Sequence, residues 1–230
     1  MEQKQNRGKL IVFEGGDGSG KTTQTQLLLK YCTDQNISHA YFDFPNYPSF
    51  FGQLIAKFLR GELGSIDKVS PYLASLPFSF DRAAMSKTIE KNLGEGRLVI
   101  LNRYASSNMA HQGSKLENDA ERESFLNWVE QLEFEVNKIP REDLVIYLHV
   151  PWQQAIELTK KKYERHYLNG KKDIQESNAL HQKKTGELYQ KFAQSKSNWE
   201  TISCFENGII LTKEIIHNKI IEILKTRKIL

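Results

Sequence analysis

The sequence predicts an α/β fold in which helices flank a doubly wound, parallel five-stranded sheet. Short β-branched or apolar runs alternate with longer helical patterns along the whole chain. Two of these runs, Arg97 to Leu101 and Leu144 to Val150, are almost entirely apolar, as expected of strands covered on both faces. No Gly- or Pro-rich linker interrupts the alternation, so we expect residues 1–230 to form one domain.

The expected elements follow one another as strand–helix units, which favours right-handed crossovers between parallel strands. Each strand is assigned from a short apolar or β-branched run, and each helix from a longer amphipathic segment. The expected strands are Leu10 to Phe13, His39 to Phe44, Arg97 to Leu101, Leu144 to Val150 and Trp199 to Cys204. The expected helices are Thr22 to Tyr31, Pro48 to Leu59, Pro71 to Leu93, Asp119 to Asn137, Gln153 into the 160s, and the tail from Thr212.

Composition and charge limit the class of protein. The chain is 39% hydrophobic and 26% charged, as is usual for a globular protein, and its net charge of +4 does not indicate a nucleic-acid or membrane partner. No apolar run approaches the ~18 residues of a membrane span, and the polar start MEQKQNRGK does not resemble a signal peptide. We therefore expect a cytoplasmic protein with no nucleic-acid or membrane partner. Cys32 and Cys204 are expected to be buried small hydrophobes.

Residues 15–22 read GGDGSGKT and match the phosphate-binding loop G-x-x-x-x-G-K-[ST]. The motif follows an apolar run and opens a helical segment, so its backbone N–H groups and the helix N-terminus can surround phosphates. Lys21 is expected to reach the β- and γ-phosphates, and the Thr22 hydroxyl to bind Mg²⁺. The motif predicts a nucleoside triphosphate site made by Gly15, Gly16, Asp17, Gly18, Ser19, Gly20, Lys21, Thr22 and Thr23.

Other features narrow the kind of P-loop protein. The guanine motif N-K-x-D of GTPases is represented only by Asn137-Lys138-Ile139-Pro140, which lacks the aspartate. ATP-driven motors and transporters are usually larger. A small P-loop domain with helical inserts is typical of nucleotide and nucleoside kinases.

An arginine lies within an apolar helical stripe of the segment Pro71 to Leu93. Phe78, Arg82, Met85 and Ile89 share one face of this helix. Because a bare buried arginine is very costly, Arg82 needs an anion or hydrogen-bond acceptors, and Phe78 one turn earlier offers a ring on which a base can stack. The alternative is that Arg82 pairs with a carboxylate and Phe78 packs in the core.

Five segments together resemble the thymidylate kinase family. The resemblance extends from Gly8 to Tyr189 in the order and spacing of the family. It implies a P-loop NTPase fold with a short lid and a homodimer formed through helices. It also implies transfer of the γ-phosphoryl of ATP to dTMP, with ATP and Mg²⁺ bound, giving dTDP and ADP for dTTP synthesis. The segments are EGGDGSGKTTQ (14–24), FPNY (44–47), FSFDRA (78–83), NRYASSNMAHQG (102–113) and KDIQESNALHQKKTGELY (172–189).

The resemblance also implies roles for residues in these segments. Phe78 would stack on thymine, and Arg82 and Arg103 would bind the base or the acceptor phosphate. Asp17 would accept a hydrogen bond from the sugar 3′-hydroxyl and help Thr22 to place the metal. The other residues expected around the acceptor are Phe44, Pro45, Tyr47, Ser107, Asn108, His111 and Gln112.

The expected lid, about residues 160–172, reads KKKYERHYLNGKK. Its positive charges around an Asn-Gly turn suit closure over a triphosphate, and Arg165 is expected to be its catalytic arginine, together with Lys21 and Arg103. The alternative is a solvated basic loop. Asp173 and Glu176 follow the lid, where acidic residues of the family assist sugar and metal-water contacts.

The chain departs from the family at two charged positions. Asn102 stands where the family has the aspartate of Asp-Arg-Tyr, which serves the metal shell. Asp43 stands near the place where many relatives have an arginine for the acceptor phosphate, so we expect its side chain to point away or to pair with a base. These two departures leave open a nucleotide-binding protein with impaired catalysis. His111 stands where the family often has a tyrosine beside the sugar, which leaves open a kinase for another acceptor, such as dUMP or a nucleoside.

The helix around Phe125 to Leu132 has apolar residues at positions typical of one face. The periodicity favours core packing, and because the resemblance implies a homodimer formed through helices, the stripe is also a candidate dimer face.

Overall fold

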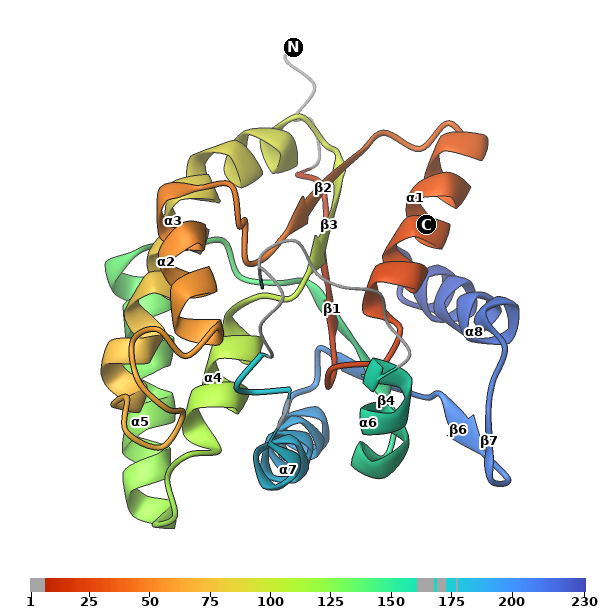
Figure 1. The fold of residues 1–230 in the computed structure, drawn as a ribbon. Coiled ribbons are helices and arrows are strands. Elements are labelled where there is room, and N and C mark those ends of the chain that lie inside the picture. Colours follow the sequence, from red (N-terminus) through yellow and green to blue (C-terminus); the bar gives the residue numbers. More distant parts are fainter. Residues whose placement is uncertain (1–6, 161–167, 169–172, 177) are drawn as a thin grey trace.

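Five parallel strands form the central sheet, in the order β2-β3-β1-β4-β5 (Figure 1). The computed structural model describes residues 7–160, 168, 173–176 and 178–230. The predicted parallel five-stranded sheet flanked by helices is confirmed, with every strand close to its expected position. The strands are β1 (Leu10–Glu14), β2 (His39–Asp43), β3 (Leu98–Asn102), β4 (Leu144–His149) and β5 (Trp199–Ser203).

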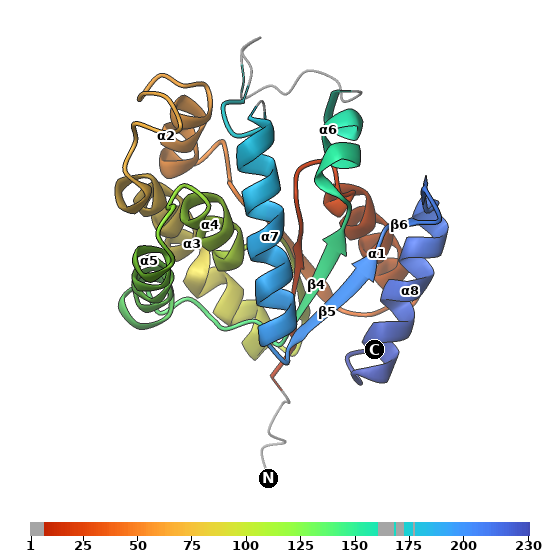
Figure 2. The same ribbon diagram turned by 90° about the horizontal axis from the view of Figure 1, so that it is seen from below.

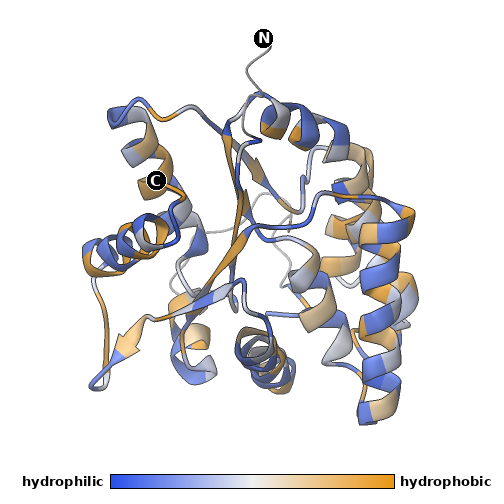
Figure 3. Ribbon diagram, turned by 180° about the vertical axis from the view of Figure 1, so that it is seen from behind, coloured by the Kyte–Doolittle hydropathy of each residue, from blue (hydrophilic) through white to orange (hydrophobic). Residues whose placement is uncertain are grey.

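Both faces of the sheet are buried, which explains the uninterrupted apolar runs. In β1, Leu10 and Val12 belong to one hydrophobic cluster, whereas Ile11 and Phe13 belong to another on the opposite face. Because successive strand residues point to opposite faces, a strand covered on both faces must be apolar at every position. Figure 3 shows these strands as mainly hydrophobic and the surrounding helices as mixed.

Helices cover the sheet in two layers. Helices α1 and α8 pack on one face, and α3, α4, α5 and α7 lie on the other (Figures 1 and 2). Helix α2 packs against α3 at the outer side of that second layer. The bounds are α1 (Lys21–Asp34), α2 (Phe50–Leu59), α3 (Pro71–Gly94), α4 (Ala105–Gly113), α5 (Asp119–Gln131), α6 (Trp152–Lys160), α7 (Ala179–Ser195) and α8 (Lys213–Thr226).

Several elements differ from the sequence-based expectations. Helices α4 and α7, and a small hairpin of β6 (Phe205–Glu206) and β7 (Ile209–Ile210), are not among the expected elements. Helix α5 ends before the expected Asn137 and continues as a π-helical turn, η1 (Leu132–Val136). None of the described helices is long and apolar enough to cross a lipid bilayer. Cys32 and Cys204 are free and buried, as expected.

The stripe on α5 packs into the core. Phe125 and Val129 are fully buried in the hydrophobic cluster between the sheet and the second helix layer, and the Phe125 ring lies edge-to-face with Tyr72, with 5.2 Å between the ring centroids. The interpretation of this stripe as core packing is therefore confirmed, and Phe125 and Val129 are not available for a dimer face.

Candidate active site

The loop between β1 and α1 follows the carboxyl end of β1, next to the ends of β3 and β4. Gly15, Gly18 and Gly20 have φ angles of 149°, 86° and 91°, which only glycine adopts readily. A Cβ on Gly15 would lie 2.6 Å from the Leu148 carbonyl oxygen, so this glycine also permits a close approach to β4. Gly20 caps α1 without a side-chain hydrogen bond, leaving the first N–H groups of the helix to face an anion.

The buried Lys21 side chain folds back over this loop. Its Nζ donates to the carbonyl oxygens of Gly15 and Gly16 at 2.9 and 2.8 Å. The next residue, Thr22, accepts a hydrogen bond from Asn102 Nδ2 at 3.4 Å. The loop thus holds a cation and a hydroxyl at the mouth of the helix, as binding of a phosphate and a metal requires.

Two hollows meet beside the loop. The loop hollow, of about 660 Å³, is lined by Gly18, Gly20, Lys21, Thr22, Asp43 and Asn102. The acceptor hollow, of about 580 Å³, is lined by Phe78, Arg82, Ser107, Asn108, His111 and Gln112 together with residues that follow the expected lid. Both hollows are lined by the same five residues: Asp17, Phe44, Pro45, Tyr47 and Arg103. A group bound in one hollow would therefore face a group bound in the other across this shared wall.

Arg103 occupies the shared wall directly after β3. Its φ of 66° lies in the left-handed region, and its N–H donates to the Phe13 carbonyl at 3.0 Å. Its guanidinium pairs with Asp17 and donates to Ser107 Oγ at 3.1 Å. Burial alone would lower the pKa of Arg103, but the nearby Asp17 carboxylate and the other neighbouring groups together raise it by more than burial lowers it. The net shift is upward, so the side chain stays charged. The wall therefore presents a fixed cation with a defined orientation.

Helix α7 supports this wall from the side. Gln182 Nε2 donates to Asp17 Oδ2 at 3.2 Å. His181 Nε2 lies 3.3 Å from His111 Nδ1, and its Nδ1 lies 3.1 Å from Ser114 Oγ. The sequence did not single out Gln182 or His181, because polar residues on an amphipathic segment normally indicate its solvent face.

The polarity of this histidine chain follows from Arg103. Arg103 Nη1 lies 3.4 Å from His111 Nε2, and a guanidinium can only donate, so Nε2 must accept. His111 Nδ1–H then donates to His181, whose own Nδ1–H donates to Ser114. Burial lowers the pKa of His111 well below its ordinary value and that of His181 to about 4. Both rings are therefore neutral near pH 7.

Arg82 lies in the wall of the acceptor hollow but already has an anionic partner. Its guanidinium pairs with the fully buried Glu133, which also accepts from Ser79 Oγ at 2.6 Å. The alternative of a carboxylate partner therefore holds for Arg82. Because Glu133 balances the charge, the pair suits hydrogen bonding to an uncharged base better than binding of a phosphate.

Unpartnered acceptors identify what the acceptor hollow can bind. Among the described residues, Asn108 Oδ1 and Gln112 Oε1 are buried without a hydrogen-bond partner. The orientation of the Asn108 amide is fixed, because its Nδ2 donates to the Ser75 carbonyl at 3.1 Å and to Ser79 Oγ at 3.2 Å. Phe78 lies in the same wall, edge-to-face with Phe58. A flat ligand with an N–H donor and a further hydrogen-bond donor would satisfy these acceptors.

Ser107 belongs to the framework of the site. Its hydroxyl donates to Glu14 Oε2 at 2.7 Å and accepts from Arg103. Glu14 is fully buried and also accepts from the N–H groups of Tyr104 and Ser107 at the start of α4, and from Tyr189 of α7. The sequence did not single out Glu14, although it directly precedes the glycine-rich loop.

Asp81, next to Arg82 in the sequence, holds the Phe44 to Tyr47 segment in place. It accepts from Asn46 N–H at 2.8 Å and from Ser49 Oγ at 2.6 Å. Phe44-Pro45 is a cis peptide bond. These contacts anchor the segment that forms the shared wall.

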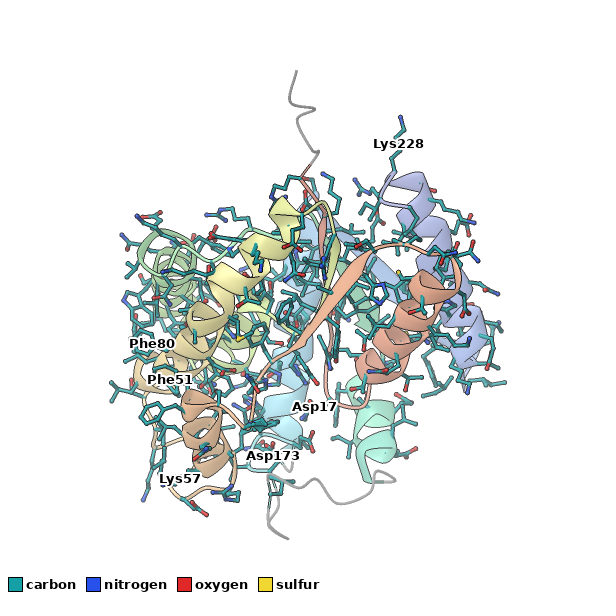
Figure 4. All side chains as sticks on the ribbon, turned by 90° about the horizontal axis from the view of Figure 1, so that it is seen from above. Asp17, Phe51, Lys57, Phe80, Asp173 and Lys228 are labelled. Carbon is teal, nitrogen blue, oxygen red and sulfur yellow. The ribbon has the colours of Figure 1, made fainter. Side chains whose placement is uncertain are left out.

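Residues that follow the expected lid reach the acceptor hollow. Asp173 and Glu176 line it, and Asp173 lies near Asp17 in Figure 4. Asp173 Oδ1 accepts from the N–H groups of Gln175 and Glu176. Arg165 lies outside the described residues, as does most of the expected lid.

Asp43 faces the loop hollow, so of its two expected arrangements, pointing away or pairing with a basic side chain, the first is wrong. Desolvation by the surrounding site residues raises the pKa of Asp43, although the residue remains exposed to solvent, and the neighbouring charges of Arg103 and Lys21 favour its ionised form. Asp43 is thus a second carboxylate, beside Asp17, in a hollow that also contains two cations.

The fold and these two hollows define a P-loop phosphotransferase that carries a phosphoryl group from a nucleotide to a base-bearing acceptor. Comparison with known proteins makes the assignment more specific. The thymidylate kinase family model matches residues 13–216, and the chain belongs to this family. The predicted resemblance is therefore confirmed.

Relatives match most of the chain. A thymidylate kinase of Plasmodium falciparum (isolate 3D7) is 29% identical over 229 residues, covering 96% of this chain and 92% of the relative. A thymidylate kinase of Mycobacterium tuberculosis (strain H37Rv) is 31% identical over 185 residues, covering 80% of this chain and 85% of the relative. The solved structure of thymidylate kinase from Candida albicans, described as having broad substrate specificity, has a TM-score of 0.75 at 24% identity. It covers 97% of this chain and 93% of its own, and this likeness shows the fold.

Proposed function

We propose that the protein transfers the γ-phosphoryl group of ATP to dTMP, giving dTDP and ADP. Membership of the thymidylate kinase family supports this reaction. The observation that carries it is the shared wall of the two hollows, where Asp17 and Arg103 face both a phosphate-binding loop and a pocket for a base. An acceptor phosphate placed there would lie beside the donor phosphates.

The base would be recognised in the acceptor hollow. Phe78 would stack on thymine, and the unpartnered Asn108 Oδ1 and Gln112 Oε1 would accept hydrogen bonds from the ligand, the pyrimidine N3–H being the donor on the base. Arg82, held by Glu133, would donate to a base carbonyl. The segment Phe44 to Tyr47 and His111 would border the sugar, and Asp17 would accept from its 3′-hydroxyl.

Transfer requires position and positive charge rather than covalent catalysis by the protein. An acceptor phosphate oxygen would attack the γ-phosphorus in line, forming a new O–P bond while the bond to the β-phosphate oxygen breaks. Lys21 would move its donors from the Gly15 and Gly16 carbonyls to the donor phosphates. Arg103 would hold the acceptor phosphate, and Arg165 would add charge from the lid.

The residues beside Lys21 fit a magnesium ion. Thr22 offers a hydroxyl, Asp17 a carboxylate, and Asn102 an amide oxygen that is buried without a partner among the described residues. No group of three or more His, Cys, Asp or Glu side chains in the described part of the chain could hold a metal alone, so phosphate and water would complete the coordination. When bound, Mg²⁺ would neutralise charge that develops on the phosphates.

The test is ADP release with ATP and Mg²⁺ against dTMP, dUMP, UMP, dCMP, AMP and thymidine. We expect a strong preference for dTMP and a severe loss of turnover in Lys21→Ala. Because the structurally similar Candida albicans enzyme has broad substrate specificity, the panel must include other monophosphates. Preference for another acceptor would overturn the acceptor-site assignment. Binding of ATP and dTMP without turnover would show that catalysis is impaired.

We also propose that the protein forms a homodimer through α2 and α3. Phe50, Leu54 and Phe80 are 82%, 39% and 37% exposed, and the Phe51 ring contacts those of Phe50 and Phe80 at 5.3 and 5.5 Å (Figure 4). A second copy would cover this apolar patch. Sedimentation equilibrium should show weaker association for Phe50→Ser but not for Ile209→Ser, which changes an exposed side chain on β7. Equal association of both variants would contradict this interface.

A further inference from the structure

The ends of β2 and β3 place two polar side chains next to each other in the loop hollow. Asp43 and Asn102 are partners in the parallel register of these strands, and both line the hollow with Thr22. Asn102 is only 5% exposed, and its Oδ1 has no hydrogen-bond partner among the described residues. Its amide is oriented by Nδ2, which donates to Thr22 Oγ1 at 3.4 Å. A buried oxygen of this kind indicates a missing donor or cation.

The charges around the hollow indicate a cation. Arg103 is already paired with Asp17, and the charge of Asp43 offsets that of Lys21, so the side chains of the hollow leave the charge of a bound polyphosphate uncompensated. A carboxylate in that position repels a polyphosphate unless a cation lies between the two groups. Carboxylate, hydroxyl and amide oxygens are the donors that Mg²⁺ prefers.

We propose that Asp43 supplies a second negative charge to the magnesium site, beside Asp17, and acts through water molecules around the ion. Asn102 Oδ1 and the Thr22 hydroxyl provide neutral oxygens beside it. Besides Asp17 in the loop, a second carboxylate of the site thus comes from the end of β2, while the adjacent position on β3 contributes an uncharged amide. This inference rests on one part of the proposed function, namely that the protein binds an adenine nucleotide together with the ion. It does not depend on the identity of the phosphate acceptor.

Manganese binding tests the proposal without relying on activity. The protein is mixed with ADP so that the protein is in excess and nearly all ADP is bound. Mn²⁺ is then titrated in, and the EPR signal of free Mn²⁺ is followed. We expect Asp43→Asn to weaken Mn²⁺ affinity about tenfold, as is typical when an outer-shell carboxylate is lost. Adding Asn102→Asp to that variant should restore the affinity to within about threefold of wild type, because the charge returns one strand away. Asp34→Asn, at the exposed far end of α1, is the control and should leave the affinity unchanged.

Two further measurements test whether weaker Mn²⁺ binding by Asp43→Asn arises from loss of folding instead of loss of the carboxylate. In EDTA, Asp43→Asn should bind ADP as well as or more tightly than wild type, because a repelling carboxylate is gone. Asn102→Asp alone should bind Mn²⁺ more tightly than wild type. Unchanged Mn²⁺ affinity in Asp43→Asn, or a similar loss in Asp34→Asn, would overturn the proposal. If dTMP transfer fails in the wild type while the Mn²⁺ results hold, the proposed function fails and the metal assignment stands.

Discussion

At the residue scale, the position of Arg103 depends on the shape of its side chain as well as on its charge. Its guanidinium contacts Asp17, Ser107 and His111 at the same time. A lysine has a compact ammonium group and cannot reproduce this fork. We therefore expect Arg103→Lys to lower kcat/KM for dTMP by about a hundredfold or more, as loss of a transition-state donor does.

Steady-state kinetics with dTMP and with ATP varied in turn would measure this loss. Unfolding in urea serves as the control, because the free energy of unfolding of Arg103→Lys should be close to that of wild type. Near-normal kcat/KM in Arg103→Lys would show that only a positive charge is needed at the shared wall.

The Arg82–Glu133 pair makes a prediction about stability. Both side chains are almost fully buried, so removal of the Glu133 charge leaves an unbalanced buried cation. Glu133→Gln should lower the free energy of unfolding by about 3 kcal/mol, whereas Glu130→Gln, in the exposed pair with Arg141, should change it by less than about 1 kcal/mol. Urea denaturation of both variants measures the difference, and equal effects would refute the argument.

At the element scale, Glu14 joins three elements of the site. Its carboxylate lies at the end of β1, accepts from two N–H groups at the start of α4, and accepts from Tyr189 of α7. Glu14→Gln replaces one acceptor oxygen with an amide that faces donors, so we expect a loss of about 2 kcal/mol or more in the free energy of unfolding. Asn118→Ala, which removes an exposed N-cap on α5, should cost about 1 kcal/mol. A smaller effect at Glu14 than at Asn118 would contradict the joining role.

The same elements explain what the sequence could and could not predict. The strands and helices α1, α2 and α3 were predicted because apolar runs and a loop motif identify them. Helix α4 was not, because all nine of its residues, Ala105–Gly113, are buried and most are small or polar, so it shows no apolar stripe. On α7, the buried positions include His181, Gln182 and Thr185, which a periodicity argument assigns to solvent.

The motif and the family resemblance identified most of the candidate site residues. Their hydrogen-bond and ion-pair partners could be found only in the structure. Arg82 and its carboxylate are 51 residues apart in the sequence, and Asp17 and Gln182 are 165 apart. No local pattern encodes such pairs. For Asp43, the sequence left two possibilities, pointing away or pairing with a basic side chain, and only the structure shows that it faces a hollow lined by Lys21 and Arg103.

At the scale of the whole molecule, His111 and His181 couple folding to pH. Their rings connect α4 with α7 across the interior, and burial lowers the pKa of both in the folded protein. In the unfolded chain each ring titrates near its ordinary value of about 6.5. Below that pH the unfolded state therefore binds more protons than the folded state, and stability falls as pH falls.

For His181, whose folded pKa is about 4, this difference removes roughly 2 kcal/mol of stability between pH 7 and pH 5. His181→Gln cannot take up that proton, so it should lose less stability over this interval than wild type, although it is less stable at pH 7 because Gln fits the chain between His111 and Ser114 poorly. Urea denaturation at pH 7 and pH 5 measures both proteins. An equal pH dependence for wild type and His181→Gln would mean that His181 does not titrate on unfolding, and that the acid sensitivity of the fold arises elsewhere.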